Sequence, residues 1–393
     1  MSRLPWPGGL DLAGPASDPR AVDERMMRHA LALARRGLGN TWPNPAVGAV
    51  VWRIEGGRPI IVGRGWTQPG GRPHAETVAL AQAGDLARGA SMAVTLEPCS
   101  HFGKTAPCCN AIREAGVARV VSAIEDPDPR VNGRGHIILR AAGIEVAVGM
   151  LAREARASNL GFIRRVVDKR PGVTLKLAVT ADGVAGRSDG ARLLITGPEA
   201  NRRVHMLRAQ HDAVMVGIGT VLADDPQLTC RLPGLESRSP VRIVLDAALR
   251  TPVGSRLVQT AHAVPTWILA ATDASEAAEE ALAGFGVVVE RVEAEDGPGR
   301  LSLVHALERL AARGLTRVLC EGGPTLGEAL VRGDLVDNVI VLSSPDRYAG
   351  PAGAAVPGFG PALRHLVGMA ETFQATPERR LGRDSLRLIT RRF

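Results

Sequence analysis

The chain has 393 residues, too many for one compact core, and this length predicts two domains. A content of 45% hydrophobic and 3% aromatic residues is typical of a globular protein, and the apolar stretches are too short to span a bilayer. The net charge of +8 comes from dispersed arginines with few aromatic residues between them, which favours a small anionic ligand over nucleic acid. Five cysteines, an odd number, argue against a disulfide framework, and no signal sequence is recognised, so we expect a cytoplasmic protein.

The first half of the chain alternates helices and strands behind a mobile tail at residues 1–20. Apolar periodicity and turn residues give the bounds of these elements. We expect a helix over 21–38, strands over 47–51 and 60–64, a helix starting near His74, a strand over 92–96, a helix over 110–115, a strand over 119–124, a helix over 136–142 and a strand over 144–148. This alternation predicts a three-layer α/β domain over residues 21–168.

The composition turns basic and polar over residues 164–171, and we place the domain boundary there. The second domain, 172–393, alternates again, and its Gly/Pro-rich stretch 348–361 is expected to be a loop. We expect strands over 173–179, 213–216, 241–245, 267–270, 287–289, 317–320, 338–342 and 386–391, and helices over 198–210, 301–312 and 325–331. The second domain is therefore also predicted to be α/β.

Metal-ligating side chains cluster in the first domain. His74 and Glu76 lie at a predicted helix start, Cys99 follows a predicted strand, and Cys108 and Cys109 open the next helix. Zinc deaminases use one His and two Cys as ligands, a water in the fourth position, and a non-ligand Glu that moves protons. This set predicts a zinc hydrolase with Glu76 as the acid/base, and the spacing leaves the choice between Cys108 and Cys109 open. A closed structural zinc site that also uses Cys109 or His101 is the alternative, and it would leave Glu76 without a role.

The loop between the cysteines is longer than in many zinc deaminases. Eight residues separate Cys99 from Cys108, whereas nucleic-acid and nucleoside deaminases have a tight Cys-x-x-Cys. Lys104 lies in this loop, and a cation beside the metal can hold a phosphate or a polar ring. A solvated loop lysine is the equally simple reading.

Three stretches of the second domain have residues suited to an anionic ligand. Lys176 lies on a predicted strand, Gly217-Ile218-Gly219 follows a predicted strand as a turn, and Glu321-Gly322-Gly323 joins a strand to a helix. Glycine-rich turns of this kind let backbone N–H groups approach phosphates. No stretch completes G-x-G-x-x-G, so a standard dinucleotide fingerprint is absent.

Several motifs of the first domain resemble one family. The motifs are Asn44-Pro45, His74-Ala75-Glu76, Glu97-Pro98-Cys99-Ser100-His101, Gly103-Lys104-Thr105, Pro107-Cys108-Cys109, and Asp126-Pro127 with Gly133-Arg134-Gly135. Together they look like the bacterial bifunctional riboflavin-biosynthesis deaminase/reductase, and the resemblance covers most of the chain. It implies a cytidine-deaminase-like first domain that acts on a 2,5-diamino-6-(phosphoribosylamino)pyrimidinone.

The resemblance also implies roles for single residues of the first domain. It makes Cys108 the third zinc ligand, beside His74 and Cys99, and Glu76 the catalytic residue. The implied substrate contacts are Asn44, Lys104 and Asp126. The family often has Asn where this chain has Asp128, which weakens any role for that position.

The second domain is similar to the reductase of the same family, whose fold is like dihydrofolate reductase and whose donor is NADPH. The resemblance implies that the nucleotide is bound by Ala178, Thr220, Asp224, Gly323, Pro324 and Thr325. It likewise implies that the substrate is bound by Lys176, Arg208, Leu228, Arg231 and Glu321. Arg208 and Arg231 suit a clamp for a phosphate dianion. The family's Ser-x-Trp before Ile-Thr-Gly is replaced here by Arg192 and Leu194.

These observations predict a two-domain enzyme of riboflavin synthesis, in which deamination is followed by reduction of the ribosyl group to ribityl. The implied cofactors are Zn²⁺ and NADPH, and the family suggests a homo-oligomer. Two alternatives stay open. One is a nucleoside or tRNA-type zinc deaminase with an inactive second domain. The other is a zinc-stabilised nucleic-acid-binding protein, which would show steeply salt-dependent RNA binding.

Overall fold

The computed structural model describes residues 18–102, 106–189, 193–294, 300–368 and 371–392. The chain divides into two compact units. Unit 1 contains the residues up to Gly37 together with Asn44–Leu160, and unit 2 contains Leu38–Pro43 together with the residues from Gly161 onward. Residues 161–168, which the composition assigned to the first domain, thus cluster with the second. None of the described helices is long and apolar enough to cross a membrane.

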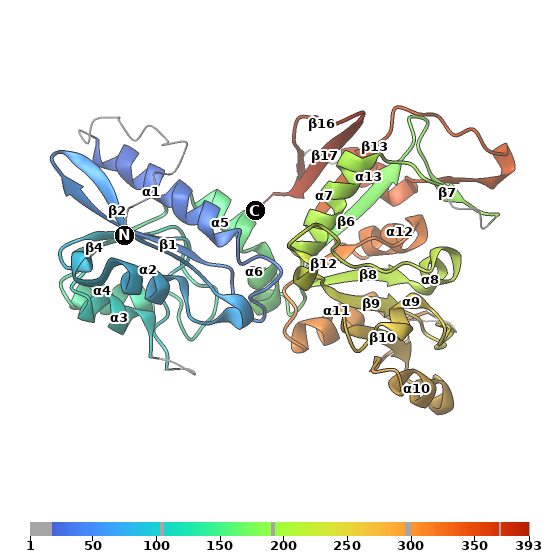
Figure 1. Ribbon diagram of the computed structural model, residues 1–393, viewed down its shortest axis with the longest axis horizontal. Helices are drawn as coiled ribbons and strands as arrows, with labels where there is room; N and C mark the ends of the chain where they lie inside the picture. The colour runs from blue at the N-terminus through green and yellow to red at the C-terminus, as the bar shows by residue number, and fades with distance from the viewer. Residues whose placement is uncertain (1–17, 103–105, 190–192, 295–299, 369–370, 393) are drawn as a thin grey trace. The chain divides into compact units, whose positions relative to one another are not determined.

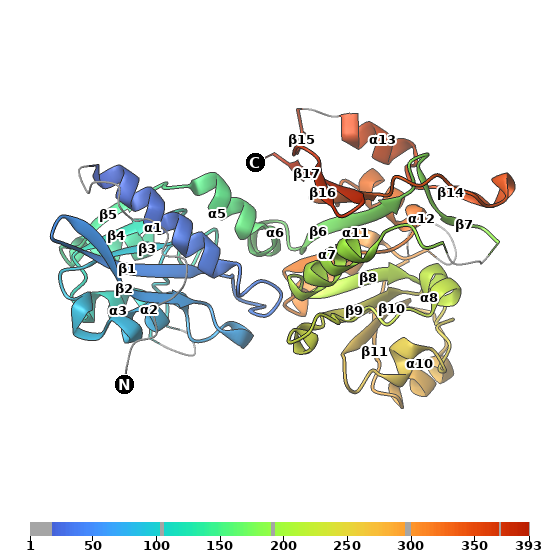
Figure 2. The ribbon, with the colours of Figure 1, turned by 45° about the horizontal axis from the view of Figure 1, so that its top comes forward.

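Unit 1 is built on a five-stranded sheet with helices on both faces (Figures 1 and 2). The strands are β1 (Gly48–Glu55), β2 (Arg58–Trp66), β3 (Ser91–Val94), β4 (Arg119–Ser122) and β5 (Glu145–Val148), in the order β2-β1-β3-β4-β5. The helices are α1 (Pro19–Ala34), α2 (Ala75–Ala83), α3 (Cys108–Glu114), α4 (Arg134–Ala141) and α5 (Ala152–Ser158). The predicted three-layer arrangement and the β1–β2 hairpin are confirmed.

Helix α1 lies directly on β1 because a glycine allows the close approach. A Cβ atom at Gly48 would lie 1.9 Å from the carbonyl oxygen of Ala30. The buried face of α1 includes Met26, Met27 and Ala30, which recur at helical spacing. The helix ends at Ala34, four residues before the end that the apolar pattern predicts.

The parallel pairing of β3 with β4 determines where the metal-ligand motif lies. The carboxyl ends of neighbouring parallel strands meet at one edge of the sheet. Here the segment after β3, which carries Glu97 and Cys99, lies beside the segment after β4, and the Glu97 amide donates to the Ile124 carbonyl at 2.9 Å. The loop that begins at Asp126 therefore starts next to the metal-ligand segment.

Unit 2 has a ten-stranded sheet of order β11-β10-β9-β8-β12-β6-β13-β17-β15, with β16 paired to β17, and a separate β14–β7 pair. Its strands are β6 (Gly172–Val179), β7 (Val184–Arg187), β8 (Ala213–Gly217), β9 (Val241–Leu245), β10 (Thr266–Ala271), β11 (Val288–Val292), β12 (Arg317–Cys320), β13 (Asn338–Ser343), β14 (Ala355–Pro357), β15 (Phe373–Ala375), β16 (Arg379–Leu381) and β17 (Asp384–Arg391). Its helices are α6 (Leu160–Val167), α7 (Pro198–Ala209), α8 (Ile218–Asp224), α9 (Arg256–Gln259), α10 (Glu276–Ala283), α11 (Leu303–Ala312), α12 (Pro324–Arg332) and α13 (Pro361–Gly368). The strands from β11 to β13 run parallel, and β17 is antiparallel to β13.

Alternate residues of the central strands of unit 2 pack against different helices. On β6, Val173, Leu175 and Leu177 join a buried cluster with residues of α11, α12 and α13. The next residue after Leu177, Ala178, packs against a different cluster, which includes residues of α7. Because successive side chains of a strand point to opposite faces, the sheet is covered on both sides. The predicted α/β class is confirmed for this half as well.

Two expectations about loops in unit 2 are corrected. The segment from Gly217 to Gly219 is not a turn: Gly217 is the N-cap of α8, which begins at Ile218 immediately after β8. The Gly/Pro-rich stretch 348–361 is not all loop, because β14 within it pairs with β7. In both cases glycine or proline indicated a turn where long-range pairing or packing stabilises a regular element instead.

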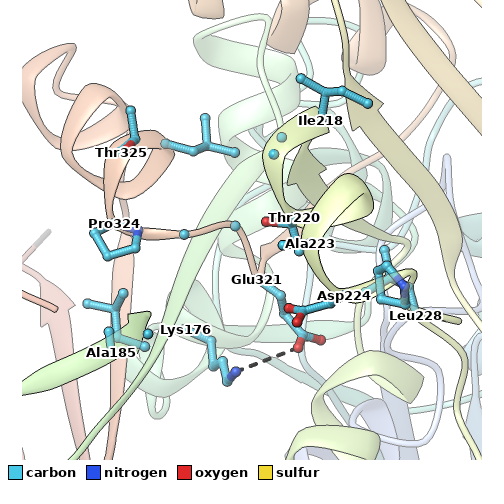
Figure 3. Close-up of a pocket in the computed structure, with 18 of the residues that line it drawn as sticks. Lys176, Ala185, Ile218, Thr220, Ala223, Asp224, Leu228, Glu321, Pro324 and Thr325 are labelled. Carbon is cyan, nitrogen blue, oxygen red and sulfur yellow. Dashed lines mark ion pairs between the residues drawn. The ribbon is translucent and has the colours of Figure 1, made fainter. Parts of the chain in front are cut away.

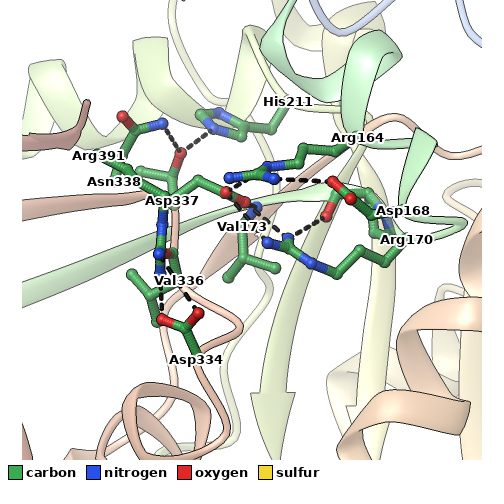
Figure 4. A network of polar contacts seen from close by, with 12 residues as sticks. Arg164, Asp168, Arg170, Val173, His211, Asp334, Val336, Asp337, Asn338 and Arg391 are labelled. Carbon is green, nitrogen blue, oxygen red and sulfur yellow. Dashed lines mark hydrogen bonds and ion pairs between the residues drawn. The ribbon is translucent and has the colours of Figure 1, made fainter. Parts of the chain in front are cut away.

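The segment that precedes β6 is anchored to unit 2 by a buried carboxylate (Figure 4). Asp337 is fully buried and accepts from Arg164 Nε at 2.8 Å, from the Arg170 guanidinium at 2.7 and 3.1 Å, and from the backbone N–H of Val173 at 2.9 Å. The basic residues that mark the predicted boundary therefore neutralise a buried acid in the core of unit 2.

A six-residue strap, Leu38–Pro43, also belongs to unit 2 although it lies between α1 and β1 in the sequence. Arg238 donates to the Leu38 carbonyl at 2.6 Å. Glycines allow the strap to approach the unit closely: a Cβ at Gly39 would lie 2.6 Å from the Ala209 carbonyl oxygen, and one at Gly314 would lie 3.1 Å from Pro43.

Candidate active sites

Three side chains of unit 1 converge as a metal-ligand cluster: His74, Cys99 and Cys108. His74 is the N-cap of α2, Cys99 follows β3, and Cys108 is the first residue of α3. The His74 Nδ1 atom lies 3.6 Å from Cys99 Sγ and 3.3 Å from Cys108 Sγ. Helix starts and the end of a strand thus bring together three residues that are far apart in sequence.

The donor set and its spacing fit zinc. Tetrahedral Zn²⁺ with Zn–S near 2.3 Å and Zn–N near 2.0–2.1 Å places its N and S ligands about 3.6 Å apart. The two N···S separations, 3.6 and 3.3 Å, match that edge length. A tetrahedral ion held by these three residues keeps one open position, which is the arrangement of catalytic zinc sites rather than structural ones.

The two thiols of the cluster differ in acidity. The hydrogen bond from the Cys108 side chain lowers the pKa of Cys99 to about 4, and the same bond raises the pKa of Cys108 well above its usual value. The Cys108 backbone N–H also donates to Cys99 Sγ at 3.2 Å. One thiolate is thus already favoured, and a metal ion that binds here releases the remaining proton.

Glu76 lies in the first turn of α2, two residues after His74, and its side chain is buried with 3% exposed. Burial raises the pKa of Glu76 to about 7, and the nearby imidazole of His74 opposes this rise. A carboxyl with a pKa near neutrality can both accept and donate a proton at physiological pH.

Cys109 is separate from the ligand cluster. Its thiol donates to the carbonyl oxygens of Pro98 at 3.3 Å and Gly135 at 3.6 Å. No role beyond that of a possible zinc ligand could be assigned to it from sequence, and in the structure it is a buried contact between the Cys99 segment and helix α4. Among the described residues, neither Cys109 nor His101 joins the three-residue cluster, so a closed four-ligand site is not formed.

The predicted substrate contacts of the first domain differ in burial, and one of them lies outside the described residues. Asn44 is half-buried and donates from Nδ2 to the Gly71 carbonyl at 3.0 Å. Asp126 is buried, and burial raises its pKa to about 7. Asp128 forms an ion pair with Arg130, at 2.5 Å. Lys104 lies outside the described residues.

Unit 2 contains a cavity of about 1610 Å³ at the carboxyl ends of its parallel strands. Each residue of the second domain that the resemblance assigned to nucleotide or substrate lines this cavity, and Figure 3 shows many of them around it: Lys176, Ala178, Arg208, Thr220, Asp224, Leu228, Arg231, Glu321, Gly323, Pro324 and Thr325. Leu194, the replacement for a family Trp, also lines it and is 78% exposed. Arg192 lies outside the described residues.

A buried ion-pair network lies in the wall of this cavity. Arg208 Nε and Nη2 bind the two carboxylate oxygens of Glu321 at 2.6 and 3.0 Å, and Lys176 Nζ lies 3.7 Å from the same carboxylate (Figure 3 shows the Lys176–Glu321 pair). Burial alone would raise the pKa of Glu321, but Arg208 and Lys176 lower it to about 2. The positive charge of Arg208 is therefore already balanced by Glu321. This weakens the prediction that Arg208 and Arg231 together bind a phosphate dianion.

Sequence reasoning missed several cationic residues of the cavity. Arg250 follows β9, Arg256 begins α9 and Arg300 precedes α11, and all three line the cavity. Arg256 pairs with Asp225 at 3.3 Å. Within the described residues, Arg250 and Arg300 have no ion pair. The sequence signal for such a residue is a single Arg in a turn after a buried strand. This pattern is too common to predict a binding residue.

Comparisons with known proteins agree with this geometry. Residues 20–124 match the cytidine and deoxycytidylate deaminase zinc-binding region, and residues 171–349 match the RibD C-terminal domain. The chain is 41% identical to riboflavin biosynthesis protein RibD of Escherichia coli over 82% of this chain and 88% of that protein. It is 39% identical to RibD of Aquifex aeolicus over 83% and 88%.

Solved structures of the same family match nearly all of the chain. Acinetobacter baumannii RibD covers 95% of this chain and 100% of its own, with a TM-score of 0.79 and 32% identity. The Thermotoga maritima diaminohydroxyphosphoribosylaminopyrimidine deaminase/5-amino-6-(5-phosphoribosylamino)uracil reductase has the same coverage, TM-score and identity. With its zinc-ligand cluster in one unit and its cavity in the other, the chain belongs to the RibD family of bifunctional deaminase/reductases of riboflavin biosynthesis.

Proposed function

We propose that unit 1 deaminates 2,5-diamino-6-(5-phosphoribosylamino)pyrimidin-4-one with His74, Cys99 and Cys108 as zinc ligands and Glu76 as the acid/base. The observation that carries this proposal is the tetrahedral N···S spacing of the ligand cluster with Glu76 buried two residues from His74. Bound zinc supplies an activated water at neutral pH.

Glu76 then has two tasks in the deamination. It takes a proton from the attacking water and later delivers a proton to the departing amine, so that ammonia leaves and a carbonyl remains on the ring. Its nearly neutral pKa suits both tasks. Asn44, Lys104 and Asp126 bind the substrate in this proposal, with the buried Asp126 facing a polar group of the ring.

Unit 2 reduces the deaminated product in the second step. Hydride passes from NADPH to C1′ of the ribosyl group, and the sugar opens to a ribityl chain. The nucleotide is bound by Ala178, Thr220, Asp224 and the start of α12 at Gly323, Pro324 and Thr325. The substrate is bound by Lys176, Arg208, Leu228, Arg231 and Glu321. The shared cavity of about 1610 Å³ supports this assignment, since it can hold both molecules.

Further cationic side chains give the cavity a second anion-binding region. Arg250 lies after β9 and Arg300 before α11, whereas Lys176 lies on β6 and Glu321 after β12. In the sheet order, β9 and β11 lie on the other side of β8 from β12 and β6. We assign Arg250, with Arg300 and Arg256, to the phosphates of the nucleotide, away from the substrate end.

The remaining features of the protein belong to the same proposal. The enzyme acts on a small molecule, works in the cytoplasm as a homo-oligomer and does not bind nucleic acid. The absence of nucleic-acid binding is supported by arginines that form ion pairs within the protein, such as Arg119 with Asp23 at 2.7 Å and Arg164 with Asp337 at 2.8 Å. The excess positive charge is thus not gathered into one nucleic-acid surface.

One experiment tests both activities. Purified protein is given the diaminopyrimidine substrate, and ammonia release and NADPH absorbance are followed separately. The expected result is ammonia release without NADPH, and NADPH oxidation only after deamination. Absence of ammonia release would reject the first assignment, and absence of NADPH oxidation after complete deamination would reject the second.

A further inference from the structure

Glu97 is a buried carboxylate whose partners are all backbone N–H groups. Its side chain is 3% exposed. Oε2 accepts from Asp126 at 3.0 Å and from Gly133 at 2.8 Å, and Oε1 accepts from Gly135 at 2.8 Å and from His136 at 3.4 Å. No cation pairs with it among the residues that the structure describes. Glu97 thus binds the loop between β4 and α4 at both of its ends.

Hydrogen bonds from neutral donors to a carboxylate are stronger than those between neutral groups. Four of them stabilise a loop that has no regular structure of its own between Asp126 and Gly133. An uncharged carboxamide could not replace this contact, because its NH₂ group would face N–H donors. The negative charge of Glu97 therefore matters as much as its shape.

A second contact holds the same loop end. The Cys109 thiol donates to both the Pro98 and Gly135 carbonyls. A Cβ atom at Gly135 would lie 2.2 Å from the Pro98 carbonyl oxygen, so the loop backbone rests directly on Pro98. Pro98 lies between Glu97 and the ligand Cys99. The ligand segment and the loop that starts at Asp126 are therefore fastened together.

We propose that Glu97 is a positioning residue of the deaminase: it holds the 126–136 loop so that Asp126 stays at a fixed place relative to the zinc ligands. The inference rests on the proposed function, in which Asp126 contacts the substrate. Glu97 touches neither the metal-ligand atoms nor the substrate and acts only through the loop. It determines how well the pyrimidine binds and leaves the ligand set unchanged.

Glu97→Gln is the direct test, and Glu125→Gln is its matched control, since Glu125 is an exposed carboxylate on the same segment. We expect Glu97→Gln to keep one zinc per chain by elemental analysis and to raise KM for deamination by about tenfold, with a smaller change in kcat. NADPH oxidation with the deaminated product is expected to be unchanged and reports that the chain is folded. Glu125→Gln should leave all of these quantities unchanged.

Gly135→Ala is a second variant that keeps every carboxylate. Its added Cβ would collide with the Pro98 carbonyl and displace the loop, so it is expected to raise KM and retain zinc in the same way. Glu97→Gln is also made in an Asp126→Ala background. If Glu97 acts through Asp126, it raises KM no further there, because the two changes remove the same interaction.

Different outcomes test the positioning role of Glu97 and the deaminase activity on which it rests. An unchanged KM in Glu97→Gln, loss of zinc from it, or a full additional increase in KM in the Asp126→Ala background would overturn the positioning role. Failure of the unaltered chain to release ammonia would instead reject the proposed deaminase activity.

Discussion

Arg208→Met removes the guanidinium that balances the buried carboxylate of Glu321. Arg208 and Lys176 lower the pKa of Glu321 from 4.5 to about 2, although burial acts in the opposite direction. With each pKa unit equivalent to about 1.4 kcal/mol, the ionised form is stabilised by about 3 kcal/mol. Lys176, at 3.7 Å from the carboxylate, remains in the variant. We expect Arg208→Met to lower the free energy of unfolding of unit 2 by about 3 kcal/mol, as is usual for a broken buried pair.

The pH dependence has a definite sign. Because the pKa of Glu321 is lower in the folded state, its contribution is present above pH 4.5 and is lost as the pH falls from 4.5 toward 2. The difference between the unaltered chain and Arg208→Met should therefore narrow in acid, where protonation removes the charge that Arg208 balances.

Urea unfolding of the full chain measures the loss in the free energy of unfolding and its pH dependence. Zinc retention shows whether unit 1 is still folded. Arg231→Met is the control, because Arg231 is an exposed arginine of the same cavity and should change stability by less than about 0.5 kcal/mol. The double variant Arg208→Met/Glu321→Gln should lose less than the sum of the single variants. The reasoning would be refuted if Arg208→Met lowered the free energy of unfolding by less than about 1 kcal/mol. It would also be refuted if the double variant lost the full sum of the two single losses.

Three further predictions concern the two sites. Glu76→Gln should retain zinc and slow ammonia release by at least about 100-fold, and appreciable release would contradict its acid/base role. Cys108→Ser should lose zinc in elemental analysis, whereas Cys109→Ser should keep it, since the Cys109 thiol contacts only carbonyls; equal zinc loss in both would be inconsistent with the ligand set. Arg250→Ala should raise KM for NADPH by about tenfold, because Arg250 is assigned to the phosphates of the nucleotide, and steady-state kinetics can check this; an unchanged KM for NADPH would contradict that assignment.

The metal-ligand cluster could be predicted from sequence because its residue types are rare in combination. His74 at a helix start and Cys99 after a strand are local signals, and the structure brings them together with Cys108 as expected. The choice of Cys108 over Cys109 needed the family resemblance, because both begin the same helix. The hydrogen bonds of Cys109 now give it a different role.

Other features could not be predicted because they depend on contacts distant in the chain. Helix α6 ends in arginines, and from sequence these predicted a polar linker between the domains. In the structure Arg164 pairs with Asp337, which is 173 residues away in the chain. Glu97 is part of a motif that carries the family resemblance, but its contacts could not be predicted, since its partners are backbone groups 29 to 39 residues later. The pairing of Arg208 with Glu321 likewise joins α7 to the end of β12, and no local pattern records it.

The strap Leu38–Pro43 has a consequence for anyone who wants to separate the two activities. The polypeptide passes between the units after Gly37, after Pro43 and after Leu160, so one cut cannot yield two complete halves. A reductase fragment that starts at Gly161 lacks the strap and uncovers the backbone at Ala209 and the side-chain donor of Arg238. A split enzyme would need the strap supplied as a separate peptide or fused in front of residue 161 through a flexible connector.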